Sequence, residues 1–235
     1  MTSAEILDQL KALGQDSIKK VLLKHGIKEP LYGVKVEELK KIQKKIKNGY
    51  QLSLELYDSG IYDAMYLAGL IAEPEKMSKE ELQHWCRTAT SASICEYTVA
   101  WVASESRYGM ELAMEWIKSD VENIASSGWA TLSSIVAITD DSKLDMKQLK
   151  ELMDYIPSTI HTSKNRIKAA KNLFLISVGT YVKELNPYAK ELGLKIGKVN
   201  VDVGDTACKV PYVIEYIEKA EGKNIVGKKR KSARC

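Results

Sequence analysis

Residues 93–129 read SICEYTVAWVASESRYGMELAMEWIKSDVENIASSGW, and the spacing of side chains in this stretch decides the fold class. Side chains suited to a buried face recur at positions i, i+3, i+4 and i+7 in two runs: Ile94, Tyr97, Thr98 and Trp101, and then Met110, Ala113, Met114 and Ile117. This spacing places each run on one face of an α-helix. Residues 104–109 favour a turn between them, so the stretch predicts consecutive helices packed on neighbours.

The same helical spacing continues on both sides of this stretch. It recurs in residues 149–156 and 210–217, and two residue pairs have the spacing of a helix cap, Ser78 with Glu81 and Asp145 with Gln148. Only residues 199–203 alternate as a strand would, and they have no clear partner strand. The chain is therefore predicted to be all α.

Short paired helices can form two architectures. Roughly a dozen helices with tight turns and no heptad seam favour helix pairs stacked into a HEAT-like α-solenoid. Because no repeat is visible as sequence self-similarity, a compact irregular bundle would produce the same periodicity. The α-solenoid is the predicted fold.

Composition narrows the class of protein. The chain has 235 residues with 45% apolar content, enough for a substantial core, and no apolar run approaches the roughly 18 residues of a membrane helix. The four cysteines form no CxxC pair and are interpreted as reduced thiols: Cys86, Cys95, Cys208 and Cys235. We therefore expect a cytoplasmic protein that uses no metal and no cofactor.

Residues 227–235 form a basic segment after the helical part. They hold five basic residues and no acid, so the rest of the chain carries a net charge of −1 against +4 for the whole. Because such a segment is too polar to bury, we expect residues 1–226 to form a single helical domain and residues 227–235 to be a disordered tail. The tail could bind polyanions through counterion release, or it could only improve solubility.

Three motifs stand apart from the general helical pattern. Residues 31–42 read LYGVKVEELKKI, in which a Tyr-Gly-Val turn leads into a basic helix. The run from Ile196 to Pro211 centres on GDTACK at residues 204–209, and the basic ending reads GKKRK at residues 227–231. Together they resemble a divergent subgroup of the DNA alkylation repair (AlkD-type) family of HEAT-like-repeat DNA glycosylases. The resemblance extends from about Tyr32 to the end of the sequence.

The resemblance implies a concave stack of helix pairs whose basic inner surface holds duplex DNA. Characterised enzymes of this family hydrolyse the glycosidic bond of N3- or N7-alkylated purines without flipping the base into a pocket. Because an alkylated purine is already a cation, an Asp carboxylate can stabilise the developing sugar cation while Trp rings pack on the lesion. The expected partner is therefore duplex DNA, possibly alkylated, and we expect the protein to be a monomer.

The catalytic positions of the family carry other residues in this sequence. The family's Trp, and its catalytic Asp four residues later, align with Ala92 and Glu96, and its Arg on the next inner helix aligns with Gly128. Glu96 keeps a carboxylate that is one methylene longer, and it is the candidate catalytic residue. Alternatively, Glu96 only completes a helix cap with Ser93, because the spacing alone explains its presence.

Aromatic side chains are candidates for packing on a lesion. Trp129, next to Gly128, is the candidate lesion-facing ring, whereas Trp101 lies on an apolar stripe and is predicted to be buried. The three histidines lie far apart in the sequence and have no evident nucleophile as a partner.

The distribution of charge selects candidates for phosphate contacts. Between Thr88 and Asp141 there are eight acidic and two basic residues, so phosphate is expected to avoid much of this segment. Residues 35–47 hold six lysines against two glutamates, and residues 155–183 hold five basic residues and no acid. With the tail, these segments supply the candidate DNA contacts: Lys35, Lys40, Lys41, Lys44, Lys164, Arg166, Lys168, Lys171, Lys228, Lys229, Arg230 and Lys231. Alternatively, these lysines only keep helix faces solvated.

Three functions from different classes remain open. The first is a glycosylase in which Glu96 stabilises the sugar cation. The second is a non-catalytic binder of damaged or branched DNA, and the third is a protein-interaction scaffold, because α-solenoids often present their concave face to polypeptides. A shared fold does not supply an activity when the residues that perform it are replaced, so the sequence leaves catalysis open.

Overall fold

The computed structural model describes residues 1–46 and 49–234; Lys47 and Cys235 lie outside the described residues. Helices follow one another throughout this part of the chain, and no strand occurs within it, so the predicted all-α fold is confirmed. The elements are α1 (Ser3–Leu13), α2 (Asp16–Lys24), α3 (Val36–Gln43), α4 (Tyr50–Asp58), α5 (Tyr62–Ile71), α6 (Lys79–Thr88), η1 (Ile94–Val99), α7 (Ala100–Glu105), α8 (Gly109–Trp116), α9 (Glu122–Ile138), η2 (Asp141–Lys143), α10 (Met146–Thr159), α11 (Asn165–Tyr181), η3 (Lys183–Leu185), α12 (Asn186–Ile196) and α13 (Val213–Gly222).

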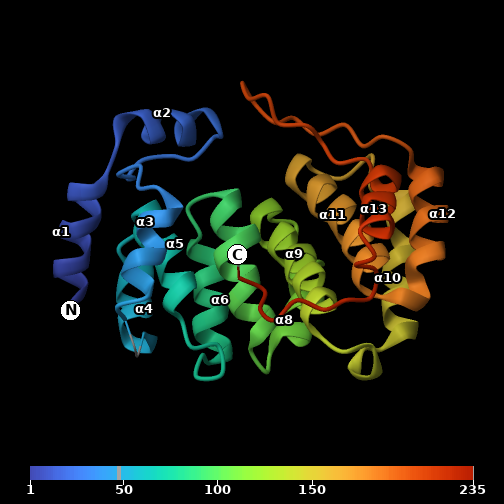
Figure 1. The fold of residues 1–235 in the computed structure, drawn as a ribbon, viewed down its shortest axis with the longest axis horizontal. Helices are drawn as coiled ribbons and strands as arrows, with labels where there is room; N and C mark the ends of the chain where they lie inside the picture. Colours follow the sequence, from blue (N-terminus) through green and yellow to red (C-terminus); the bar gives the residue numbers. More distant parts are fainter. Residues whose placement is uncertain (47–48, 235) are drawn as a thin grey trace.

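The helices stack in pairs along the long axis of the molecule (Figure 1). The pairs are α4 with α5, α6 with η1–α7, α8 with α9, α10 with α11, and α12 with α13. The second helix of each pair contacts the second helix of the next, which gives one continuous row from α5 through η1–α7, α9 and α11 to α13. This is the HEAT-like solenoid predicted from the sequence. None of the described helices is long and apolar enough to cross a membrane.

Helix caps occur where the sequence spacing predicts them. Ser78 and Glu81 form a reciprocal capping box at the start of α6. The Asp145 carboxylate accepts a hydrogen bond from the Gln148 N–H, at 2.9 Å, at the start of α10. Each cap satisfies N–H groups that have no partner inside the helix, and it therefore fixes where the helix begins.

The Tyr-Gly-Val turn of the first motif wraps around a buried carboxylate. Asp63, at the start of α5, is 1% exposed and accepts hydrogen bonds from the N–H groups of Tyr32 at 2.6 Å, Gly33 at 3.3 Å and Val34 at 2.7 Å. Gly33 has a φ of +79°, and a Cβ at this position would lie 2.6 Å from the Lys19 nitrogen, so the turn requires glycine. The motif therefore has a structural role: it fastens the segment before α3 onto α5.

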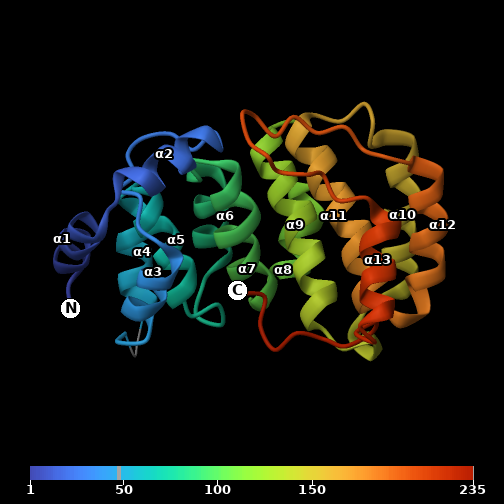
Figure 2. The ribbon, with the colours of Figure 1, turned by 45° about the horizontal axis from the view of Figure 1, so that its top comes forward.

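Two hydrophobic cores lie side by side and meet at α8. The first is built mainly by residues from α1 to α8, and Trp116 belongs to it. The second extends from Ala113 of α8 to Ile217 of α13. Two segments outside the helix pairs, residues 198–211 and 227–234, run between the parts of the molecule that contain these cores (Figures 1 and 2).

Residues 198–211, here called the arch, extend from α12 toward α2 (Figure 1). Asn165 of α11 holds its first part: the Asn165 side chain donates to the Asp202 carbonyl at 2.8 Å and accepts from the Asp202 N–H at 2.7 Å. The Asn172 side chain holds its end by donating to the Pro211 carbonyl at 2.8 Å. At the far point of the arch, a Cβ added to Gly204 would lie 3.3 Å from the Lys24 carbonyl oxygen. The arch therefore connects α11 with the end of α2.

Residues 227–234, here called the belt, cross the carboxyl ends of the inner helices one after another. The Gly227 N–H donates to the Thr180 carbonyl of α11 at 2.9 Å, and the Arg230 N–H donates to the Ala137 carbonyl of α9 at 2.8 Å. The Ala233 N–H then donates to the Glu105 carboxylate at the end of α7, at 2.7 Å. Figure 2 shows the belt reaching α7.

Basic side chains strengthen these crossings. Lys229 Nζ donates to the Val136 carbonyl at 2.8 Å and pairs with Asp141 at 2.7 Å. Arg234 donates to the Leu70 carbonyl of α5 at 3.0 Å and pairs with Glu105 at 3.2 Å. The carboxyl end of a helix carries partial negative charge and carbonyl groups without partners, and cations stabilise both. In place of the expected disordered tail, the structure therefore shows an ordered segment across residues 227–234.

Because Arg234 binds the ends of two inner helices, Arg234→Ala is expected to lower the free energy of unfolding by about 2 kcal/mol, the usual range for a lost hydrogen bond to a charged group. The melting temperature should fall by roughly 4–8 °C, at about 2–4 °C for each kcal/mol in a chain of this size. Calorimetry checks the change. Lys231→Ala is the matched control, because Lys231 is exposed in the same segment. Equal stability of the two variants would show that the belt contributes nothing through Arg234.

Candidate nucleic-acid interface

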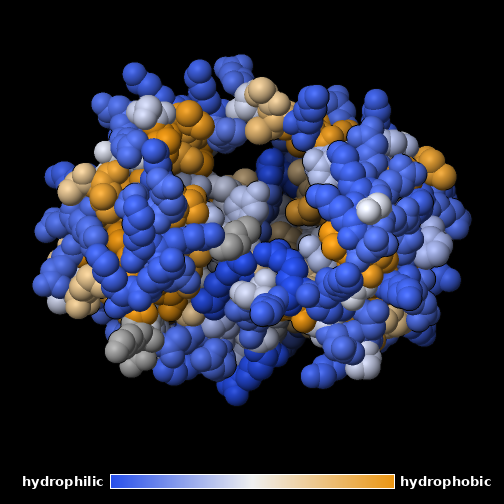
Figure 3. Space-filling view, viewed as in Figure 1, coloured by the Kyte–Doolittle hydropathy of each residue, from blue (hydrophilic) through white to orange (hydrophobic). Residues whose placement is uncertain are grey.

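The molecule is hollowed between its two halves, and both hydrophilic and hydrophobic side chains border the hollow (Figure 3). Two adjoining pockets form this groove, and both are lined by Glu96 and Tyr97. The first, here called the α13 pocket, has a volume of about 400 Å³ and lies among η1, α9, α11, α13 and the belt. The second, here called the arch pocket, has a volume of about 650 Å³ and lies among α2, η1, α11 and the arch.

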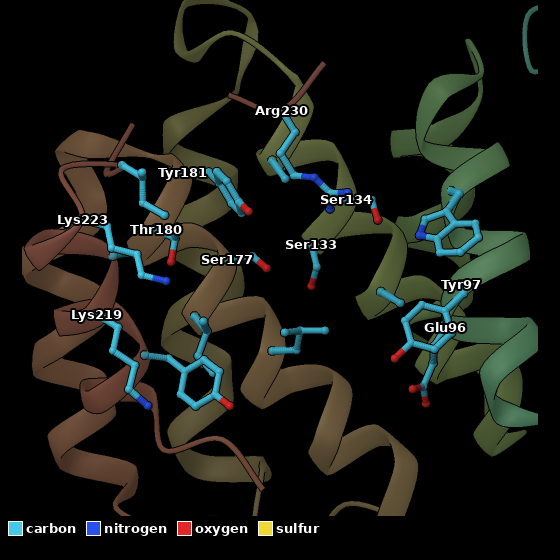
Figure 4. A pocket seen from close by; sticks show the side chains of 18 residues that line it. Glu96, Tyr97, Ser133, Ser134, Ser177, Thr180, Tyr181, Lys219, Lys223 and Arg230 are labelled. Atoms are coloured by element: carbon cyan, nitrogen blue, oxygen red, sulfur yellow. The ribbon is translucent and has the colours of Figure 1, made fainter. Parts of the chain in front are cut away.

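A π-helix positions the two shared residues. Residues Ile94–Val99 form the π-helix η1, which continues directly into α7. Single π-helical turns inside α-helices are rare and are frequently found at functional sites. Here the turn carries Glu96 and Tyr97, which line both pockets; Figure 4 shows them at one side of the α13 pocket.

The alternative interpretation of Glu96 as a capping residue is wrong. The Ser93 side chain makes no capping hydrogen bond to η1, and its hydroxyl donates instead to the Tyr62 hydroxyl at 3.3 Å. Ser91 takes the capping position, because its hydroxyl oxygen accepts from the Ile94 N–H at 3.3 Å. The position of Glu96 is therefore not explained by a cap at the start of η1.

Arg166 of α11 binds both carboxylate oxygens of Glu96. Arg166 Nε donates to Oε1 at 2.9 Å and Nη2 donates to Oε2 at 2.5 Å. The exposed fraction is 13% for the Glu96 side chain and 33% for the Arg166 side chain. Burial raises the pKa of Glu96 above its ordinary value, and the hydrogen bonds from Arg166 oppose that rise. The result is a bidentate ion pair in the middle of the groove.

This pairing limits what Glu96 can do chemically. A catalytic carboxylate stabilises a sugar cation through its negative charge, which must be directed at the reacting atom. The charge of Glu96 is already compensated by the guanidinium of Arg166, which contacts both oxygens. The observed geometry therefore disfavours Glu96 as a carboxylate that acts on a sugar.

The α13 pocket has the polar chemistry of a phosphate site. Lys219 and Lys223 enter it from the side of α13, and Arg230 enters from the belt (Figure 4). Hydroxyl groups from α9 and α11 lie between them: Ser133, Ser134, Ser177, Thr180 and Tyr181. Glu96 is the one carboxylate among the described residues that line this pocket. Basic and hydroxyl side chains are the groups that most often contact nucleic-acid phosphates.

The arch pocket is more mixed in charge. Its basic lining residues are Lys24, His25, Arg166 and Lys209, and its acidic ones are Glu96 and Asp202. The backbone of Asp202 is fixed by Asn165, so the arch forms a fastened wall of this pocket. Arg166 is the cation that connects the arch pocket with Glu96 at the border of the α13 pocket.

The prediction that Trp129 is an exposed, lesion-facing ring is wrong. Trp129 is 1% exposed in the second core, where its ring lies parallel to Tyr155 and meets Phe174 edge-on. The neighbouring Gly128 also faces a helix: a Cβ there would lie 2.7 Å from the Ile117 nitrogen, which leaves no room for an arginine. Trp101, predicted to be buried, is 3% exposed and is part of the first core.

Lys171, a predicted phosphate contact, is buried. Its residue is 3% exposed, and the ammonium donates to the hydroxyls of Thr159 at 2.8 Å and Ser163 at 2.9 Å. It also lies 5.7 Å from the centre of the Trp129 ring and 4.8 Å from that of Tyr155. Burial lowers the pKa of Lys171 to about 8. It lies on the side of α11 that faces α9 and α10, so it cannot reach a phosphate in the groove.

The other predicted basic residues divide by location. Arg166 and Arg230 line the groove. Lys229 is used by the belt, and Lys164 donates to the Asp120 carbonyl at 2.7 Å. The remaining candidates line neither pocket: Lys35, Lys40, Lys41, Lys44, Lys168, Lys228 and Lys231.

Sequence reasoning missed Lys219 of α13 and Lys223, the residue directly after this helix. Tyr216, Lys219, Ala220 and Lys223 are spaced i, i+3, i+4 and i+7, which is the spacing of one helix face. Apolar periodicity does not reveal this face, because two of its four residues are lysines. The same spacing, applied to basic and aromatic residues together, would have found this face.

Comparisons with known proteins agree with this fold. The sequence profile of a family described as DNA alkylation repair enzymes matches residues 6–186. The uncharacterized protein Lmo0209 of Listeria monocytogenes is 31% identical over 228 residues, covering 95% of this chain and 99% of that protein. The uncharacterized protein Lin0241 of Listeria innocua is 30% identical over 228 residues, with the same coverage.

A solved structure is similar over its whole length. It is described as a new family of proteins related to the HEAT-like repeat DNA glycosylases with affinity for branched DNA structures. The TM-score is 0.92 at 33% sequence identity, and the match covers 100% of both chains.

Lys171→Met tests the buried ammonium through the pH dependence of stability. Because the folded-state pKa is about 8 and an ordinary lysine titrates at 10.5, burial disfavours the protonated form. Burial of the charged ammonium therefore lowers the free energy of unfolding, and this penalty has its full size below pH 8 and disappears as the pH rises toward 10.5. Relative to the variant, the wild type should therefore gain stability between pH 8 and 10 and show a constant difference below pH 8. Urea unfolding at pH 7, 8, 9 and 10 measures this.

The variant should fold, because the two hydroxyls keep their own acceptors. Thr159 donates to the Tyr155 carbonyl and Ser163 donates to the Thr159 carbonyl, each at 2.8 Å. A difference between variant and wild type that stays constant from pH 7 to pH 10 would contradict the lowered pKa of Lys171.

Proposed function

Because the chain belongs to the DNA alkylation repair enzyme family, we propose that it binds DNA in the groove between its two halves, with branched DNA as the preferred form, and that it does not hydrolyse the glycosidic bond. The observation that carries this proposal is the pairing of Glu96 with Arg166 beside a pocket whose other polar side chains are cations and hydroxyls.

Electrostatics support the binding half of the proposal. Lys219, Lys223 and Arg230 contribute three positive charges to the α13 pocket, while the charge of Glu96 is compensated by Arg166. Such a site attracts phosphate and releases condensed counterions when DNA binds. Preference for branched DNA is carried over from the similar solved structure, whose description names that affinity.

The compensated charge of Glu96 supports the second part of the proposal, that the protein does not hydrolyse the glycosidic bond. The family's Asp position is occupied by Glu96, both oxygens of which are bound by a guanidinium. The two other positions aligned with the family's catalytic residues hold Ala92 and the tightly packed Gly128. Neither can supply a ring for the lesion or a cation for the backbone.

The proposal also specifies the form of the DNA and the oligomeric state of the protein. Duplex arms of the DNA would occupy the groove, with alkylation tolerated but not required. The groove is formed by residues of one chain, which is consistent with a monomer that acts without a partner subunit. A cytoplasmic location stays a prediction from the sequence.

Binding is tested by fluorescence anisotropy with a labelled four-way junction and a linear duplex, from 50 to 200 mM KCl. Affinity should fall with salt, and Lys219→Gln should reduce the slope of log K against log salt by about 0.9, which corresponds to one phosphate contact. The matched control is Lys195→Gln, which removes an exposed lysine of α12 that lines neither pocket. Absence of salt-dependent binding to either DNA would refute the proposal and favour a protein-interaction scaffold.

Catalysis is tested by the release of N7-methylguanine and N3-methyladenine from alkylated duplex DNA. Neither the wild type nor Glu96→Gln should release base. Glu96→Gln should instead bind DNA more tightly, with a salt slope steeper by about 0.9, because the charge of Arg166 is no longer compensated. Base release by the wild type that is lost in Glu96→Gln would establish the glycosylase alternative.

A further inference from the structure

The α13 pocket contains exposed apolar side chains that a phosphate site does not need. Four of the large apolar residues that the structure leaves exposed line it: Tyr97 at 46%, Leu173 at 44%, Tyr216 at 42% and Ile225 at 37%. They come from η1, α11, α13 and the segment that follows α13. Apolar surface gathered in one concave place usually marks a ligand site.

The aromatic rings select the class of ligand. In an intact duplex the base faces are covered by their neighbours, so a duplex presents only phosphates, sugars and base edges to a protein. An unpaired base exposes its flat faces, and tyrosine rings bind such faces by stacking. A pocket that combines tyrosines with lysines therefore matches a nucleotide that has left the stack better than it matches a duplex backbone.

The arrangement of charge fits the same ligand. The Lys219 ammonium lies over the Tyr216 ring, 4.8 Å from its centre, so a cation is in contact with one face of the ring that would bind the base. Lys223 follows one turn later, and Arg230 lies across the opening (Figure 4). These cations suit the phosphates on either side of the nucleotide. The nearly buried hydroxyls of Ser177 and Ser133 suit the base edge, with Ser133 as an acceptor because its own hydroxyl donates to the Trp129 carbonyl at 2.9 Å. The volume of about 400 Å³ falls in the range of roughly 300–1,000 Å³ that is usual for small-molecule sites.

We propose that the α13 pocket binds one unpaired nucleotide of the DNA, with its base against Tyr97 and Tyr216 and its phosphates on Lys219, Lys223 and Arg230. The inference rests on the proposed function, because the pocket is reached through the same groove. It adds a physical reason for a preference for branched DNA, since bases at a branch point are more easily unpaired than those inside a duplex.

The experiment compares two DNA molecules that differ by one nucleotide. One is a duplex that contains a single bulged 2-aminopurine, and the other is the same duplex with 2-aminopurine paired to thymine. Anisotropy of a terminal label measures affinity, and 2-aminopurine fluorescence reports whether the base stacks. The bulged duplex should bind about tenfold more tightly, and its 2-aminopurine emission should fall when protein is added.

Variants of Tyr216 identify the pocket as the site. Tyr216→Ala should remove the preference for the bulge and the loss of fluorescence, so that the bulged and the paired duplex bind with equal affinity. Tyr216→Phe should keep both effects, because it keeps the ring. Leu194→Ala is the control for removal of an exposed large apolar side chain, since Leu194 is 67% exposed and lines neither pocket.

The outcomes separate this inference from the proposed function. Equal affinity for the two duplexes, with no fluorescence change, would overturn the nucleotide pocket and leave groove binding intact. A preference for the bulge that survives in Tyr216→Ala would also overturn it, because the base would then stack elsewhere. Failure of the wild type to bind either duplex or a four-way junction would overturn the proposed function itself.

Discussion

The ion pair between Glu96 and Arg166 sets the geometry of the groove. Glu96 lies on η1, which contributes to the first core, and Arg166 lies on α11, which contributes to the second. Removing two charges from water costs several kcal/mol for each ion, and only close, hydrogen-bonded contact offsets that cost. Moving η1 away from α11 would separate the charges, so the pair opposes widening of the groove between these two walls. It also keeps the carboxylate turned toward a guanidinium and away from a ligand.

Ion pairing also explains why the acidic stretch from Thr88 to Asp141 can border a site for polyanions. Three of the eight acids in this stretch are paired with bases that occur later in the chain: Glu96 with Arg166, Glu105 with Arg234, and Asp141 with Lys229. Charge counted along the sequence therefore overstates the negative potential of the groove, because compensation comes from residues about 70 to 130 positions away. Two of the three bases belong to the belt. Its cations act mainly on the protein itself, and Arg230 is the belt residue that faces the groove.

The positions of the helices could be predicted from the sequence, but which face of each helix lines the groove could not. Apolar spacing and the Ser78–Glu81 cap predict where helices form, because both depend on neighbours within one turn. The π-helix could not be predicted, since it differs from an α-helix only in the hydrogen-bond partner. The face of α9 that lines the groove was also hidden, because this helix is buried on nearly all sides. Trp129 beside Gly128 suggested exposure, and the tight contact of that glycine with α8 turns it into the core instead.

The belt affects the order in which the repeats can complete their packing during synthesis. In an ordinary solenoid each repeat touches only its neighbours, so early repeats can finish packing while later ones are still being synthesised. Here Leu70 lies 164 residues before the arginine that binds its carbonyl, and Ala233 belongs to the first core. The amino-terminal repeats must therefore leave the ribosome with a gap in their packing that is filled only after the second half has appeared. Until then, the carboxyl ends of α5 and α7 stay uncovered and open to chaperones and proteases.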